Sequence, residues 1–120
     1  MTRFDRFVTI ATAATLLGGL LSFGAHAQNV TTEQYRNPKN EKDLNFNKAY
    51  LTGIKDGLIA YNMSSEDKLF CMPGPIPILT FEQANNALLH WARKKSADAE
   101  SLPLGLALLY GLKEAFPCPK

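Results

Sequence analysis

Two cysteines, Cys71 and Cys118, are the side chains of this sequence best able to form or break covalent bonds. As free thiols they would serve a nucleophilic or redox reaction, which a Cys-x-x-Cys pair or a neighbouring imidazole normally supports. The sequence has no Cys-x-x-Cys pair, and His90 is the only histidine beyond residue 27. As a disulfide, the two cysteines would instead close a loop of about 47 residues and stabilise the fold by about 4 kcal/mol.

Acid–base and metal chemistry would have to use His90 or a carboxylate. His90 has no histidine partner for a metal site, and helical periodicity places it on a solvated face. The candidate carboxylates lie on polar faces or in turns, where nothing desolvates them enough to tune a pKa for catalysis. They are Asp56, Glu66, Asp67 and Glu82. We therefore expect no catalytic residue, no metal site and no cofactor.

Motifs and composition exclude further classes of function. The sequence lacks a Gly-rich phosphate loop, a G-x-S-x-G elbow and an H-E-x-x-H pair, so we expect no enzyme. Its formal net charge of +2 over 120 residues is too small for the basic surface of a nucleic-acid-binding protein. A hydrophobic fraction of 46% and a charged fraction of 20% are typical of one globular domain.

The first 27 residues have the three parts of a secretory signal peptide. Arg3 and Arg6 precede an apolar run from Phe7 to Gly24, and Ala25-His26-Ala27 supplies the small residues that signal peptidase requires. The alternative is an uncleaved membrane helix, but the run is shorter than the roughly 20 apolar residues needed to span a bilayer and is diluted by threonines. We predict cleavage after Ala27 and a periplasmic protein that does not remain in the membrane.

Export also decides between the two interpretations of the cysteines. An even number of cysteines in a small exported domain favours a disulfide, because the compartment is oxidising. We therefore predict a structural bond between Cys71 and Cys118. A domain of this size buries only about two-thirds of its unfolded surface, so the cross-link matters for its stability.

Hydrophobic periodicity predicts an all-α fold of three helices. The first covers residues 43–62. The second follows a capping box, Thr80-Phe-Glu-Gln83, and runs to about Lys95. The third begins at Pro103, a favoured start for a helix, and continues to Phe116. No segment alternates between apolar and polar residues, so we expect little or no sheet.

The first predicted helix contains two glycines, Gly53 and Gly57, beside its apolar face. Each costs about 1 kcal/mol relative to alanine inside a helix. Their spacing of four residues indicates that another helix or loop packs close against the backbone there; the alternative is that one glycine marks a break. The apolar face comprises Phe46, Tyr50, Ile54, Leu58 and Tyr61, with Leu44 and Leu51 at its edge.

Two segments are predicted to lie outside the helices. Residues 28–42 are polar, and we expect a flexible leader ahead of a helical domain over residues 43–120. Cys71 to Leu79 holds three prolines at alternate positions, which predicts an extended connection.

Candidate partner-binding residues lie on the third helix and in the proline-rich connection. Leu106 and Tyr110 are exposed if the third helix lines only one core, and buried if that helix is enclosed. Ile76 and Ile78 either cover the core or present a second apolar edge. Both alternatives stay open for each pair.

The assembled pattern resembles the Rap/Tai family of periplasmic immunity proteins of type VI secretion. The shared elements lie between residues 43 and 119: Tyr50-Leu-Thr-Gly53-Ile-Lys-Asp-Gly57, Phe70-Cys71-Met-Pro73, Thr80-Phe-Glu-Gln83 and Ala115-Phe-Pro-Cys118. The resemblance implies a small helical domain with a Cys71–Cys118 disulfide and a homodimer. Family members bind a cell-wall amidase toxin and block its active site, with no catalytic residue of their own. This chain is more proline-rich over Gly74 to Ile78, so its partner differs if contacts run through that loop.

We therefore expect a non-enzymatic periplasmic protein that binds and blocks a peptidoglycan amidase. One alternative is a periplasmic acid-stress chaperone, which would hold unfolded clients once its carboxylates are protonated. Another is a structural subunit of an envelope complex.

Overall fold

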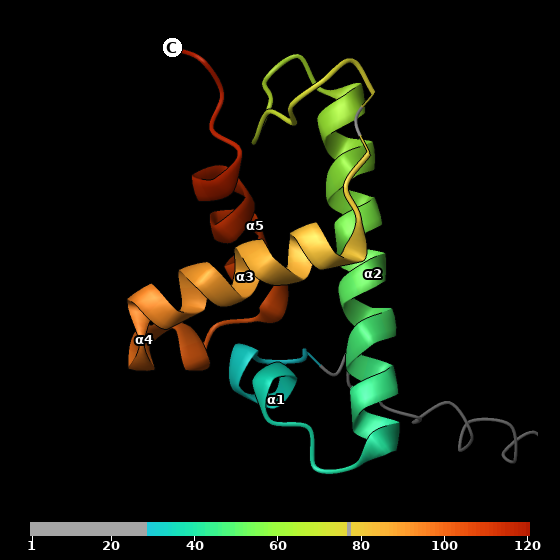
Figure 1. Cartoon of the computed structure of the whole chain (residues 1–120), viewed down its shortest axis with the longest axis vertical. Helices are drawn as coiled ribbons and strands as arrows, with labels where there is room; N and C mark the ends of the chain where they lie inside the picture. Colours follow the sequence, from blue (N-terminus) through green and yellow to red (C-terminus); the bar gives the residue numbers. More distant parts are fainter. Residues whose placement is uncertain (1–28, 77) are drawn as a thin grey trace, which may run out of the picture.

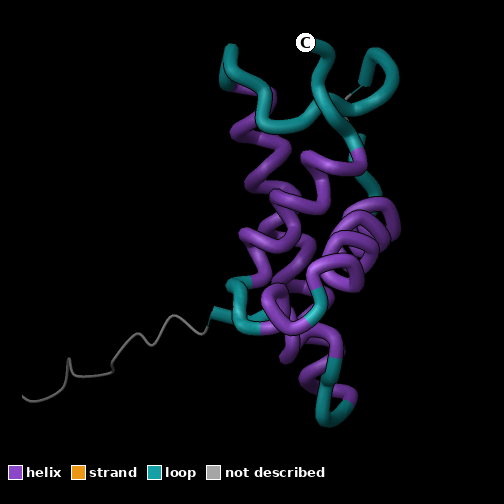
Figure 2. Tube along the Cα trace, turned by 90° about the vertical axis from the view of Figure 1, so that its left-hand side faces the viewer, coloured by secondary structure: helices purple, strands orange, loops and turns teal. Residues whose placement is uncertain are grey.

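The computed structural model describes residues 29–76 and 78–120, which contain five helices (Figure 1). In chain order they are α1 (Thr32–Arg36), α2 (Glu41–Ser64), α3 (Phe81–Lys95), α4 (Ala97–Glu100) and α5 (Leu104–Ala115). Turns and loops connect them (Figure 2), and an isolated bridge pairs Thr31 with Pro103. The all-α prediction is confirmed over this part of the chain. The predicted signal peptide lies outside the described residues.

Local signals in the sequence set the ends of α2. The side chain of Asn40 accepts a hydrogen bond from the backbone N of Asp43 at 2.8 Å, which satisfies one free donor of the first turn. At the other end, Lys68 Nζ donates to the carbonyl oxygens of Asn62 and Ser65. The predicted helix over residues 43–62 is confirmed and is two residues longer at each end.

α3 and α5 cross at close range because Gly111 has no side chain. A Cβ on Gly111 would lie 2.6 Å from the backbone oxygen of Ala87, so the two helix backbones touch there. The predicted capping box also forms at the start of α3, where Thr80 and Gln83 exchange hydrogen bonds of 2.9 and 3.1 Å. The side chains buried around this crossing are Leu88, Trp91, Leu104, Leu108 and Leu112.

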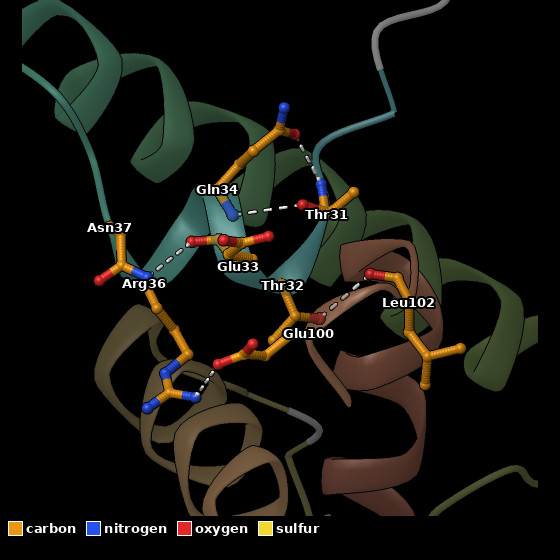
Figure 3. Close-up of polar contacts among 8 residues, drawn as sticks. All are labelled: Thr31, Thr32, Glu33, Gln34, Arg36, Asn37, Glu100 and Leu102. Atoms are coloured by element: carbon orange, nitrogen blue, oxygen red, sulfur yellow. Dashed lines mark hydrogen bonds and ion pairs between the residues drawn. The ribbon is translucent and has the colours of Figure 1, made fainter. Parts of the chain in front are cut away.

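Residues 29–42 differ from the predicted flexible leader, because they pack against the helical body. Val30 and Thr32 are buried. The backbone N of Thr32 donates to Leu102 O at 3.0 Å, and Leu104 N donates to Val30 O at 2.8 Å. The Thr32 hydroxyl also donates to Leu102 O, at 3.2 Å, and Figure 3 shows this contact between α1 and Leu102. The polar residues that suggest a loose segment in the sequence serve as caps and as backbone partners instead.

The buried side of α2 also differs from the predicted face. Leu51 is fully buried, and Asn47 and Asn62 are buried along the same side. Phe46 and Tyr61 were expected inside, yet 49% and 51% of their surfaces are exposed. The reason is that α2 flanks the α3–α5 pair on one side only (Figure 1), so a narrow stripe of the helix is enough to cover the core.

Candidate partner-binding surfaces

A disulfide joins Cys71 to Cys118 and so ties the middle of the chain to its tail. The backbone N of Cys71 also donates to Phe116 O at 2.8 Å, so the two segments are joined by a covalent and a hydrogen bond. Both cysteines of the sequence are used in this bond. The structural interpretation of the cysteines is confirmed, and the free-thiol alternative is wrong.

The loop between α2 and α3 is fastened at both ends. Asn62 anchors its first part: Nδ2 donates to Phe70 O at 2.6 Å, and Oδ1 accepts from Leu69 N at 2.8 Å. Phe70 is buried beneath it, and Leu79 is buried at the far end, just before the α3 capping box. Only the segment between these anchors is free to project.

The projecting segment exposes the two predicted isoleucines. Ile76 and Ile78 have 64% and 63% of their surfaces exposed, so they do not cover the core. A largely apolar cavity of about 370 Å³ lies between the end of α2 and the first part of the loop; Met63, Met72 and Pro75 are among the residues that line it, and neither isoleucine is. We call the described residues of this segment, 72–76 and 78, the wedge loop. Figure 1 shows it at the same end of the molecule as the C-terminus.

The outer side of α5 forms a separate exposed surface. Leu106 and Tyr110 are 43% and 44% exposed, so the alternative of a fully enclosed third helix is wrong. Tyr110 stacks on the buried Trp91 with ring centroids 5.4 Å apart. Leu106 lies in the first turn of α5, near α4, whereas the wedge loop lies at the opposite end of that helix (Figure 1). The structure therefore does not unite the four candidate residues in one patch.

Gly53 and Gly57 do not hold another element of the same chain. A Cβ at either position would meet no atom within 4 Å, and α2 continues unbroken through both. Within the described residues, the prediction of a close helix or loop is therefore wrong, and so is the alternative of a break. The glycines instead lie on a largely exposed stripe of α2, in which Tyr50 alone is half-buried. We call this the outer stripe, and its members are Phe46, Tyr50, Gly53, Gly57 and Tyr61.

Sequence reasoning missed the glycine that does set a helix contact. Gly111 and Ala107 are small residues four apart on α5, and both are buried. Gly53 and Gly57 on α2 have the same spacing of four residues. The leucines around Gly111 dominate the periodicity of α5, so the spacing alone does not mark Gly111 as a helix contact.

His90 lies on the solvent-exposed side of α3, as predicted. Its Nε2 is 3.9 Å from Glu114 Oε1, which also accepts a hydrogen bond from Lys94 Nζ at 2.5 Å. The hydrogen bond from Lys94 holds the pKa of Glu114 below its ordinary value. Asp56 pairs with Lys55 at 2.5 Å. Among the described residues there is no group of three or more histidine, cysteine or acidic side chains that could hold a metal ion.

A groove of about 440 Å³ lies between α1, the first half of α2, and α3. Three cations from three elements line it: Arg36, Lys48 and Arg93. Its apolar lining is Pro38, Leu44, Phe81 and Leu89, and no carboxylate is among the described residues that line it. We call it the basic groove. No local sequence pattern indicates this groove, because its cations are far apart in the chain.

A hydrogen bond of 2.6 Å crosses the basic groove from the Tyr35 hydroxyl to Asn85 Oδ1. It connects α1 to α3. Burial raises the pKa of Tyr35 to about 12. The hydroxyl therefore stays protonated at neutral pH and keeps its role as donor.

Comparison with known proteins gives one match. A family model described as Rap1a immunity proteins matches residues 22–118. No curated protein and no solved structure matches the chain. None of the helices in the described residues combines the length and the apolar character needed to cross a membrane.

Proposed function

This chain belongs to the Rap1a immunity protein family, and from that premise we propose that it neutralises a peptidoglycan amidase toxin by covering the toxin's active-site cleft. Occlusion needs a surface that fits the cleft and requires no reacting group. The exposed position of His90 and the ionised state of Glu114 are consistent with a non-enzymatic protein. The proposal extends to a toxin delivered by type VI secretion.

The wedge loop is the observation that carries this proposal. A segment that enters a cleft binds more tightly when it is ordered beforehand, because ordering it during binding costs free energy. The disulfide, the Asn62 anchor, Pro73 and Pro75 support this order in the described residues of the loop. Burying one isoleucine side chain contributes about 1.5 to 3 kcal/mol, and Ile76 and Ile78 are both available.

We propose that Leu106 and Tyr110 form a second contact with a protein partner. The Trp91 ring beneath Tyr110 holds the tyrosine in place, and amphipathic aromatic side chains are favoured at interfaces. This surface and the wedge loop lie toward opposite ends of α5. A single partner would therefore have to extend along the helix to contact both.

Export to the periplasm is part of the proposal. The signal-peptide pattern with cleavage after Ala27 supports it, and so does the disulfide, since such bonds persist in oxidising compartments. The intact mass of protein purified from the periplasm should correspond to a chain that begins at Gln28. A mass that includes residues 1–27 would contradict this step.

We also propose a homodimer in which the outer stripes of two copies of α2 meet. Two exposed aromatic side chains with glycines between them provide a helix surface that a second helix can approach closely. Gly57→Leu should keep the helix intact and yield a monomer in analytical ultracentrifugation, whereas Ala97→Leu, at an exposed position of α4, should leave the dimer unchanged. A wild-type protein that stays monomeric at high concentration would contradict the dimer.

The function is tested by mixing the purified protein with the cell-wall amidase encoded in an adjoining reading frame or, where none adjoins, with the exported amidases of the same genome. We expect tight co-purification with one of them and loss of its peptidoglycan hydrolysis. The double variant Ile76→Asp with Ile78→Asp should lose inhibition, while Ala97→Asp should retain it. Unchanged hydrolysis across all of these amidases would overturn the proposal.

A further inference from the structure

We propose that the basic groove binds an acidic side chain of the toxin that has an apolar residue next to it. This inference rests on the proposed function, because it names a feature of the partner. It concerns a different part of the molecule from the wedge loop and follows from different observations.

Positive charge is concentrated in the groove, although the chain as a whole has only a small net charge. The whole sequence has a formal net charge of only +2, yet three cations line this one groove, and none of its described lining residues carries a carboxylate. Converging charges of one sign raise the local potential and attract a ligand of the opposite sign. Two of the cations are arginines, Arg36 and Arg93, whose planar guanidinium groups bind carboxylates through paired hydrogen bonds.

The walls of the groove are formed before any partner arrives. The Tyr35–Asn85 hydrogen bond joins α1 to α3, and Asn47 Nδ2 donates to Gln34 O at 3.0 Å to join α2 to α1. The Thr31–Gln34 capping box holds the start of α1 (Figure 3). A preformed site avoids the cost of ordering three helices during binding.

One of the cations is held loosely enough to change partner. Arg36 Nη1 lies 3.7 Å from Glu100 Oε1, and both side chains are partly exposed (Figure 3). Exposed pairs at this distance contribute little to stability. A carboxylate entering the groove can therefore take over Arg36 without breaking a strong interaction.

The apolar lining selects among anions. Leu44, Phe81 and Leu89 offer a surface that a free phosphate or a sulfate would leave unused. An aspartate or glutamate next to a leucine or phenylalanine uses both the cations and this surface. A protein segment of that composition is the occupant that fits, and a neutral or basic segment does not.

Charge reversal at the rim tests the inference on the inhibited amidase. Lys48→Glu combined with Arg93→Glu should weaken amidase binding at least tenfold and reduce its dependence on salt concentration. Lys42→Glu together with Lys95→Glu makes the same change in charge at exposed positions that neither line the groove nor belong to the other proposed contact surfaces, and should stay within twofold of the wild type. Groove variants that bind as well as this control would overturn the inference, even where Ile76→Asp abolishes inhibition. Circular dichroism verifies folding, and Lys48→Gln with Arg93→Gln replaces the first variant if it unfolds.

A short peptide tests the groove without the toxin. The probe is an acetylated hexapeptide with two glutamates and two leucines, and its control carries glutamine in place of glutamate. In ¹⁵N NMR spectra of the full protein, the acidic peptide should shift the amides of Tyr35, Lys48 and Arg93, and the control should not. If no amidase is inhibited, the proposed function fails and the peptide experiment alone tests the groove. Shifts with the acidic peptide only would then still support an acidic ligand in the basic groove. The same spectra with both peptides would overturn this inference as well.

Discussion

Gly111 and Gly57 show how the same residue type acts differently in two environments. At Gly111 the missing side chain lets α5 touch the backbone of α3, so packing requires the glycine. At Gly57 a Cβ would meet no atom of the described residues within 4 Å, so among them the glycine only lowers helix stability. Sequence spacing alone did not distinguish the two positions, because the difference depends on which residues lie across the helix.

Gly111→Ala should destabilise the protein by about 1 to 3 kcal/mol, since Ala87 would have to move away from the new methyl group. Gly57→Ala should stabilise the monomer by about 1 kcal/mol. Urea unfolding at a protein concentration that keeps the chain monomeric measures both. Equal effects of the two substitutions would contradict the described helix crossing.

Tyr35 makes the free energy of unfolding depend on pH in the alkaline range. Its pKa is raised to about 12 in the folded protein because of burial, whereas in an unfolded chain tyrosine ionises near pH 10. Between these values the unfolded chain has lost a proton that the folded chain keeps, so the free energy of unfolding falls as pH rises from about 10 to about 12. Below pH 10 both states are protonated and this contribution is constant.

Tyr35→Phe should therefore flatten the loss of stability between pH 10 and pH 12. The measurement is the urea midpoint at several pH values in that range. Tyr61→Phe, at an exposed position, is the matched control and should retain the wild-type slope. The same slope in both variants would show that Tyr35 does not have the assigned environment.

At the scale of the elements, α2, α3 and α5 were predictable and α1 and α4 were not. The long helices have strong periodicity, a capping box at Thr80 and a proline at residue 103, all of which act locally. α1 and α4 have five and four residues, too short for periodicity or for stability on their own. They depend on contacts such as the hydrogen bond from Thr32 to Leu102, which no local pattern reveals.

The loop between α2 and α3 owes its shape to Asn62. Asn62→Ala should leave Phe70 O and Leu69 N without partners and cost about 1 to 3 kcal/mol. Hydrogen exchange should become faster over residues 65–79 and stay unchanged in α5. Asn86→Ala, at an exposed position on α3, should change neither stability nor exchange. Unchanged exchange in Asn62→Ala would contradict the role of this side chain as an anchor.

At the scale of the whole molecule, the covalent bond between the middle and the end of the chain was predictable from compartment and cysteine count. The positions of the candidate surfaces were only partly predictable. Exposure of Ile76 and Tyr110 was one of two alternatives that their segments left open, whereas the basic groove arises where three elements converge and had no local signal at all. Convergence of this kind depends on tertiary packing, so the candidate sites were less predictable than the fold.

Removing the disulfide tests how far it sustains the whole fold. Cys71→Ser with Cys118→Ser should lower the free energy of unfolding by about 4 kcal/mol, because the closed loop spans 47 residues. The wedge loop should then lose much of its pre-ordering, so toxin binding should weaken as well. Chemical denaturation of the variant measures the stability. A variant as stable as the wild type would show that noncovalent packing alone holds the tail in place.

The most direct test of the central claim is a titration of the amidase toxin with this protein while peptidoglycan hydrolysis is followed. We predict that activity falls linearly and disappears at one equivalent of wild-type chain per toxin. The wedge-loop variant with Ile76→Asp and Ile78→Asp should leave activity near its starting value. Hydrolysis that continues undiminished in excess wild-type protein would contradict the account.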